Sequence, residues 1–305
     1  MFNSATAYRI IPTFQYQPEA FAGSIGAQLF VPCGPTQERS VGFVEPRNEK
    51  HGALVEVVAG QIILALQIET KSVPAALIKR KVDEKAAQIE AATGRKPGKR
   101  EKKEMKEDVT RELLPMAFSK LARVPVWIDP AAMLAVVGTS SQSVADDAVT
   151  ALCKSIDGFG VTSLMTALEP AGAMSSWLRE QEAPAWFSID RDCELKATDE
   201  SKSVVRYANH ALDIEEVRQH IEGGKRPTRL GMTFSDKVSF ELTANLQLRK
   251  IEFLDGVFEG SGGNSANNFD ADVAIQTGEL SKLIPSLLDA LGGESKLAAT
   301  EAEAS

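Results

Sequence analysis

Apolar positions in the first third of the chain follow two spacings, and each spacing predicts a different element. Residues 53–58 and 61–70 are rich in β-branched side chains and are separated by Ala59-Gly60, as in a pair of strands. Residues 75–93 instead carry apolar side chains at helical spacing, with Lys and Arg between them. Gly94 follows this pattern and suits the left-handed end of a helix. We therefore predict a β-rich start followed by a long amphipathic helix.

A second helix is predicted over residues 100–113, where Glu and Lys alternate at the spacings of an exposed helix. Pro97-Gly98 separates the two helices, and Pro115 ends or bends the second one because proline lacks an amide donor. Together the two helices would form a projecting, charged unit.

The rest of the chain mixes strand and helix patterns without a regular βαβ rhythm, which predicts an α+β fold with largely antiparallel sheets and long helices. We divide the chain into four parts of one subunit, with approximate boundaries: β-rich residues 1–70, basic projecting residues 71–123, α/β residues 124–200 and α+β residues 201–305. Strands are predicted at 124–129, 133–138, 161–168 and, as a meander, 229–253; helices are predicted at 143–156 with Ser143 as N-cap, 174–181, 214–221 with Asp213 as cap, and 278–291.

Positive charge is concentrated in one region of an acidic chain. The whole sequence has a formal charge of −8, yet residues 71–123 hold 15 Lys and Arg against 8 Asp and Glu, a local charge of +7. Separated charge of this kind is typical of a local site for a polyanion on an otherwise acidic surface. A solvated helix face is the alternative interpretation of the same residues.

An aromatic residue follows the basic run. Residues 94–106 contain seven Lys and Arg, and Phe118 comes next with Lys120 and Arg123 just beyond it. Cations along a phosphate backbone, with an aromatic ring that stacks on a base, form a sequence-independent way of binding nucleic acid. A core position is the alternative for Phe118.

Catalytic motifs are weak in this sequence. His51, His210 and His220 have no zinc-ligand spacing, and the glycine-rich residues 260–264 lack the Lys-Ser/Thr of a phosphate-binding loop and are expected to form a flexible loop. The pair Asp270 and Asp272 is expected on a strand, where their side chains would point to opposite faces. We therefore predict no enzyme, no metal site and no cofactor.

Three cysteines, Cys33, Cys153 and Cys193, lie far apart in the sequence without a CxxC pair. We expect reduced, buried thiols, with neither a disulfide framework nor a zinc site. The sequence has no run of about 18 apolar residues and no pattern of an export signal, so a cytoplasmic location is expected.

Several stretches carry a resemblance to a known family. The sequence resembles the RdgC family of bacterial recombination-associated proteins along nearly its whole length. The stretches that carry the resemblance are residues 30–34, 60–62, 112–119, 127–129, 220–225, 269–272, 277–280 and 291–294.

This resemblance implies a DNA-binding protein that is not an enzyme and is associated with the nucleoid. Members of the family form a ring-shaped homodimer, joined by helices at one end and by β-sheet at the other, around a basic hole that admits duplex DNA. They bind single- and double-stranded DNA with little sequence preference and restrain strand exchange by RecA. The alternative is a protein that inhibits a recombinase by direct contact, with DNA binding secondary.

The resemblance also implies which residues contact DNA. Phe118 corresponds to the Phe of the family's LLPRAFS-type motif and Lys120 keeps a basic residue, whereas Met116 stands where relatives commonly have Arg. Residues 207–210 likewise stand where relatives have a stretch that is richer in Lys and Gln. We expect cations of the last third of the chain to make up for the lost phosphate contacts. The predicted DNA-binding set is Lys79, Lys85, Arg95, Lys96, Lys99, Arg100, Lys102, Lys103, Phe118, Lys120, Arg123, Lys225, Arg226 and Arg229.

Overall fold

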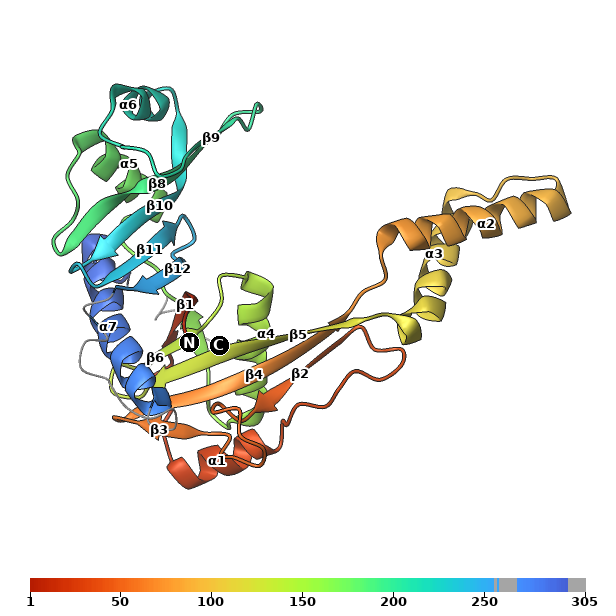
Figure 1. Ribbon diagram of the computed structural model, residues 1–305, viewed down its shortest axis with the longest axis horizontal. Coiled ribbons are helices and arrows are strands. Elements are labelled where there is room, and N and C mark those ends of the chain that lie inside the picture. Colours follow the sequence, from red (N-terminus) through yellow and green to blue (C-terminus); the bar gives the residue numbers. More distant parts are fainter. Residues whose placement is uncertain (255–256, 258–267, 296–305) are drawn as a thin grey trace.

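The protein has the shape of an arc with a hollow on one side (Figure 1). A computed structural model describes residues 1–254, 257 and 268–295. One end of the arc is a lobe of strands β8 to β12 with helices α5 and α6, and the other end is a projecting arm of helices α2 and α3. The two ends face each other across the hollow.

One sheet of 12 strands runs through the arc in the order β2-β4-β5-β6-β1-β12-β11-β10-β8-β9, with β3 beside β4 and β7 beside β1. All pairings between these strands are antiparallel in the described residues, which confirms the predicted α+β class with a largely antiparallel sheet. The strands are β1 (Ser4–Ile10), β2 (Arg39–Val44), β3 (Glu56–Val58), β4 (Gln61–Lys71), β5 (Ser119–Asp129), β6 (Leu134–Val137), β7 (Val161–Ser163), β8 (Phe187–Ala197), β9 (Val204–Tyr207), β10 (Lys225–Phe234), β11 (Val238–Thr243) and β12 (Leu248–Phe253).

Two large apolar cores hold the helices against this sheet. One core joins strands β8, β10, β11 and β12 to helices α5, α6 and α7, and the other joins β1, β4, β5 and β6 to α1 and α4. Adjacent side chains of β4 enter different cores, because Ile63 packs in the first and Ile62 and Leu64 pack in the second. The helices are α1 (Pro18–Gly26), α2 (Ala75–Thr93), α3 (Lys99–Leu113), α4 (Gln142–Ser155), α5 (Pro170–Glu180), α6 (Glu215–Glu222), α7 (Asn268–Ala290) and the short 3-10 helix η1 (Leu114–Met116).

The arm is an extension of two strands of the sheet. Strands β4 and β5 stay paired out to Lys71 and Ser119, and α2 and α3 then continue from their ends. A small apolar contact of Ile78, Val82 and Val109 joins the two helices. The predicted helix over residues 75–93 is confirmed at both ends, and Gly94 caps it with a φ of 73° while its amide donates to the Glu90 carbonyl at 2.8 Å.

Two predicted helix caps are wrong. Helix α4 has Ser141 rather than Ser143 at its N-cap, and α6 has Ile214 rather than Asp213; none of these side chains makes a capping hydrogen bond. Both helices are instead held by burial, since Ala148 and Leu152 of α4 and Val217 of α6 lie in the cores. Packing of the apolar face therefore decides where these helices start more than the cap does.

Three other predictions need correction. The strand predicted for residues 161–168 ends at Ser163. Asp270 and Asp272 lie in the first turns of α7, not on a strand, and α5 begins at Pro170, four residues before the predicted start. The predicted loop 260–264 and the chain's last ten residues, 296–305, lie outside the described residues.

The three thiols differ in exposure. Cys193 is buried and Cys33 is partly buried, but Cys153 on α4 is exposed, so the prediction that all three are buried is wrong for Cys153. Within the described ranges, none of the helices is both long and apolar enough to cross a membrane.

Candidate nucleic-acid interface

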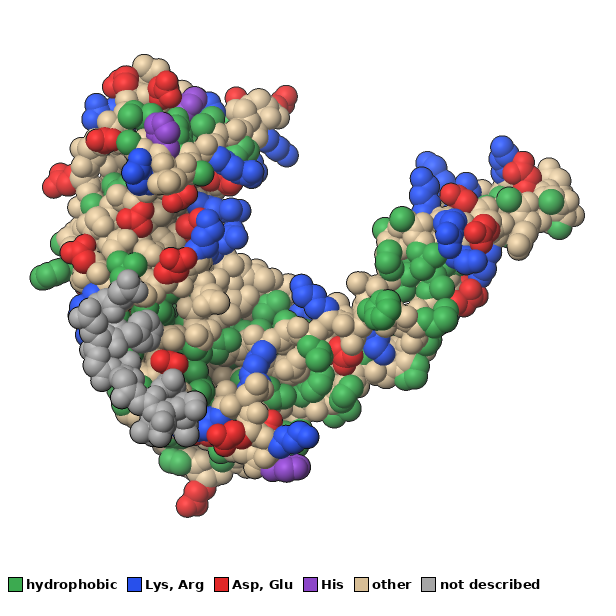
Figure 2. Space-filling model, in the orientation of Figure 1, with side chains coloured by type: hydrophobic (Ala, Val, Ile, Leu, Met, Phe, Trp, Pro, Cys, Tyr) green, Lys and Arg blue, Asp and Glu red, His purple; other side chains and the backbone are tan. Residues whose placement is uncertain are grey.

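Cationic side chains border the hollow from both ends of the arc. Figure 2 shows Lys and Arg along the edge of the lobe that faces the hollow, and again on the arm, with acidic side chains among them. The predicted set divides accordingly between the arm, the base of the arm and strand β10 of the lobe.

Five predicted cations of the arm are held by carboxylates. Lys85 of α2 donates to Glu112 of α3 at 2.8 Å and so links the two helices. The other four pairs are Arg95 with Glu101, Lys96 with Glu90, Arg100 with Glu104 and Lys103 with Glu107, at 2.6 to 3.9 Å. All five cations lie on the surface, where solvent screens such pairs and makes each of them weak.

The positive excess of the arm lies on the remaining cations. Lys79 of α2, Lys99 and Lys102 of α3 and Lys120 of β5 are exposed, and no ion pair involving them is found in the part of the chain that the structure describes. These ammonium groups need no exchange of partners before they can meet a phosphate. They are therefore the best placed of the predicted arm residues for an anionic ligand.

Phe118 is not a core residue. Its side chain is 96% exposed, and Met116 and Leu121 close to it in the sequence are 73% and 59% exposed. We call these three residues the arm patch; Figure 2 shows hydrophobic side chains gathered on the arm. Clustered exposed apolar side chains next to cations are typical of a binding surface.

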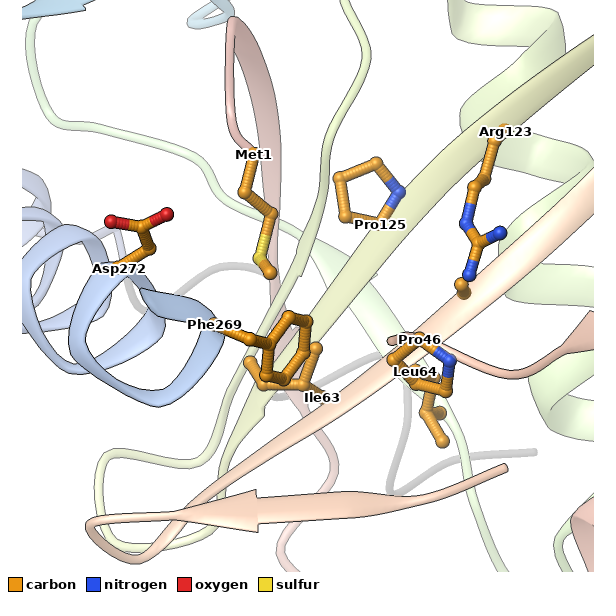
Figure 3. Close-up of a pocket in the computed structure, with 9 residues that line it drawn as sticks. Met1, Pro46, Ile63, Leu64, Arg123, Pro125, Phe269 and Asp272 are labelled. Carbon is orange, nitrogen blue, oxygen red and sulfur yellow. The ribbon is translucent and has the colours of Figure 1, made fainter. Parts of the chain in front are cut away.

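Arg123 differs from the ion-paired cations of the predicted set, because its acceptors within the protein are uncharged. Its guanidinium donates to the Asn48 side chain and to the Glu45 carbonyl, and burial lowers the pKa of Arg123. Arg123 also borders a pocket of about 340 Å³ between the start of α7 and strands β4 and β5. Figure 3 shows Arg123 on one side of this pocket and Asp272 on the other, with Phe269 and Pro125 between them.

One of the two carboxylates at the start of α7, that of Asp270, has a structural partner. Asp270 accepts from Arg47 at 2.5 Å, and Arg47 also pairs with Glu56 at 3.1 Å and lies 4.6 Å from the centre of the Phe269 ring. Arg47 thus fixes the first turn of α7 to β3. Across residues 1–254, 257 and 268–295, no group of three or more His, Cys, Asp or Glu side chains is arranged to hold a metal ion.

The lobe contributes three predicted cations, all from β10. Lys225 lies 3.3 Å from Nδ1 of His220, and Arg226 pairs with Glu169 at 3.0 Å. Arg229 stands opposite Glu194 of β8, on the face of the sheet turned away from the core. Lys225, Arg226 and Arg229 are therefore close to one another but lie across the hollow from the arm.

Two residues near Arg229 were missed from the sequence. Arg206 of β9 donates through Nε to Glu194 at 2.6 Å, with its side chain 73% exposed. A hydrogen bond from the Thr228 hydroxyl, and then the bond from Arg206, hold the pKa of Glu194 below its ordinary value. The alternation of apolar and charged residues at 193–196 indicates a strand, but only the register of β8 with β9 places Arg206 opposite Glu194.

These observations define an arc-shaped α+β protein whose hollow is bordered by cations and which carries an exposed apolar patch on its arm. Residues 1–294 match the family model described as "Putative exonuclease, RdgC". The chain belongs to the RdgC family.

Curated relatives extend the match over nearly the whole chain. The protein named "Recombination-associated protein RdgC" of Herminiimonas arsenicoxydans is 40% identical over 296 residues, which cover 96% of this chain and 98% of the relative. Proteins with the same name in Dechloromonas aromatica and Paraburkholderia phymatum are 38% and 35% identical, over 96% of this chain. The family assignment predicted from the sequence is thus confirmed. The family model's description mentions an exonuclease, whereas these relatives are named for recombination.

Proposed function

We propose that the protein binds DNA without sequence specificity, closes around it as a ring-shaped homodimer, and limits strand exchange by RecA. The observation that carries this proposal is the hollow of the arc, which has Lys and Arg side chains along the facing edge of the lobe and on the arm (Figure 2). Phosphates attract such cations by releasing counterions, and this attraction does not depend on sequence. A nucleoid-associated location in the cytoplasm follows from DNA binding.

The two ends of the arc each offer a surface for a second copy. On the arm, the arm patch exposes Met116, Phe118 and Leu121 next to the helices. At the other end, β9 is the last strand of the sheet, and an edge strand has backbone groups that can pair with another strand. Contacts at both ends would join two arcs into a ring, with helices at one junction and β-sheet at the other.

A ring can be tested by its topology. The protein is bound to nicked circular DNA and to the same DNA made linear, and the complexes are then challenged with high salt. A closed ring predicts that complexes on the circle resist the challenge while complexes on the linear form slide off its ends. Equal loss from both forms would contradict encirclement, although DNA binding itself would stand.

Inhibition of RecA by direct contact is the second candidate, because the arm's exposed cations would also suit an acidic protein surface. The two candidates are separated by adding the protein to RecA filaments that already cover all of the single-stranded DNA. No free DNA then remains for the protein to bind. Blocked access predicts little inhibition under these conditions, whereas direct contact predicts full inhibition. Release of nucleotides that requires magnesium would instead support an exonuclease.

A further inference from the structure

A row of charged side chains crosses three strands of the lobe. Arg206 of β9 stands opposite Glu194 of β8, and Glu194 stands opposite Arg229 of β10. Neighbouring strands lie about 4.8 Å apart, so the backbones of the two arginines are separated by roughly 10 Å with the carboxylate between them. Two cations are thus presented at a set spacing.

The row lies on the open face of this sheet. On β8 and β10, the neighbouring residues Cys193, Leu195 and Leu230 are buried in the core shared with α5, α6 and α7. Side chains alternate along a strand, so Glu194 and Arg229 point away from these helices. Figure 1 shows the helices of the lobe on its outer side and the sheet toward the hollow.

A β-bulge brings one more side chain to Glu194. The register between β8 and β10 shifts between Pro227 and Arg229, so Thr228 is the extra residue and lies next to Arg229 opposite Glu194. The Thr228 hydroxyl donates to Oε1 of Glu194 at 2.7 Å, while Nε of Arg206 donates to Oε2 at 2.6 Å. Both carboxylate oxygens therefore have a partner, and the carboxylate group is fixed in place.

Arg206 keeps most of its donors for a ligand. A guanidinium has five N–H donors, and Arg206 gives only its Nε–H to Glu194 in the described structure, while its side chain is 73% exposed. The side chain of Glu194 is only 13% exposed, so it lies behind Arg206. The two terminal nitrogens of Arg206 are left for the bidentate geometry that a phosphate prefers.

We infer that Arg206 and Arg229, which flank Glu194 in the row, form a site for DNA phosphates on the inner side of the lobe. The inference rests on the proposed DNA binding and adds Arg206 as a contact residue and Glu194 as the carboxylate that limits the affinity of the site. Glu194 also competes with phosphate for both arginines, because it leaves the row with a net charge of +1 instead of +2. Phosphate contacts at this row are therefore weaker than two arginines without a carboxylate between them would make.

Substitutions of single side chains test this site. Affinity for a duplex of mixed sequence is measured at 50 and 200 mM salt for the full chain and for Arg206→Gln, Arg229→Gln and Glu194→Gln. Arg179→Gln is the matched control, since Arg179 lies on α5, 51% exposed, on the other side of the sheet. Denaturant unfolding of each variant shows whether it keeps the wild-type fold.

Each lost phosphate contact lowers the slope of log affinity against log salt by about one. Arg206→Gln and Arg229→Gln should therefore weaken binding about threefold more at 50 mM than at 200 mM salt, and Arg179→Gln should not. Glu194→Gln should bind more tightly at 50 mM salt, because it keeps the acceptor for Thr228 but removes the competing charge.

The outcomes separate this inference from the proposed function. Wild-type protein that does not bind the duplex refutes both. If the wild-type protein binds the duplex but Arg206→Gln and Arg229→Gln bind it as Arg179→Gln does, this site is refuted. The proposal of DNA binding then still stands. Unchanged or weaker binding by folded Glu194→Gln overturns the role given to Glu194.

Discussion

Arg95 and Glu101 form a two-bond ion pair across the turn between α2 and α3. Nη1 and Nη2 of Arg95 donate to the two carboxylate oxygens of Glu101 at 3.0 and 2.6 Å. Glu101 also accepts from the amide of Gly98 at 2.7 Å. Amides at the start of a helix have no backbone acceptor within the helix, so a side chain such as Glu101 takes that place. A cation predicted to contact DNA therefore also fixes the turn of the arm.

Glu101 should titrate far below the ordinary range of a glutamate side chain. The bonds from Arg95 and from the Gly98 amide lower its pKa from 4.5 to about 2. Because the folded-state pKa is depressed, the stabilisation of the turn is complete above about pH 4.5 and is lost as the pH falls toward 2. A side-chain NMR titration measures this directly, with Arg95→Gln expected to raise the pKa. A wild-type value near 4.5 would show that the pair does not form in solution.

Replacing Phe118 by Ala should leave the stability of the fold unchanged and weaken DNA binding and dimer formation. The ring is 96% exposed, so its removal creates no cavity, whereas Phe43 is fully buried at 0% exposure. Phe43→Ala is the contrasting variant and should lower the free energy of unfolding by about 3–5 kcal/mol. Denaturant unfolding, solution mass and DNA affinity are compared. Normal binding with a lower unfolding midpoint for Phe118→Ala would make Phe118 a structural residue.

Arg47→Ala should destabilise the attachment of α7 to β3 by about 2 kcal/mol. Arg47 pairs with Glu56 and Asp270 and lies over Phe269, and the side chain of Glu56 is only 15% exposed. Loss of Arg47 leaves this poorly solvated carboxylate without its cation, which costs more than the loss of a surface pair. Arg80→Ala is the control, since Arg80 is 67% exposed and pairs only weakly. Equal unfolding midpoints for both variants in urea would contradict this role.

The exposed thiol of Cys153 should react before the buried thiol of Cys193. Cys153 is exposed, whereas burial raises the pKa of Cys193 to about 12 and leaves almost no thiolate at neutral pH. An alkylating reagent should therefore modify Cys153 first and reach Cys193 only after the protein unfolds. Intact mass and peptide mapping during the reaction measure this order. Early modification of Cys193 in folded protein would mean that β8 opens readily.

The sequence predicts an element well where a single pattern of apolar residues runs through the whole element. Strand β4 is predicted because Ile62 to Leu66 are all buried, and α2 because its apolar stripe ends at Gly94. The first half of β5, Ser119 to Arg123, is missed because both of its faces are exposed and no alternation marks it. The alternating residues 269–275 suggest a strand, but the buried residues Val273, Leu280 and Leu283 of α7 follow helical spacing over a longer range.

The candidate site is less predictable, because its geometry depends on strand register and on distant contacts. Phe118 and the arm cations are predicted from local composition alone. The row of Arg206, Glu194 and Arg229 depends on the register of two strand pairs and on a bulge at Thr228. The contact between Arg47 and Asp270 joins residues 223 positions apart, and no local pattern indicates it.

The most direct test of DNA binding within a dimeric ring combines solution mass with duplex affinity at 50 and 200 mM salt. We expect a mass of twice 32.9 kDa. We also expect an affinity that falls by about a hundredfold or more between the two salt concentrations, because several phosphates are neutralised together. A monomer whose affinity for DNA is the same at both salt concentrations would contradict the proposal.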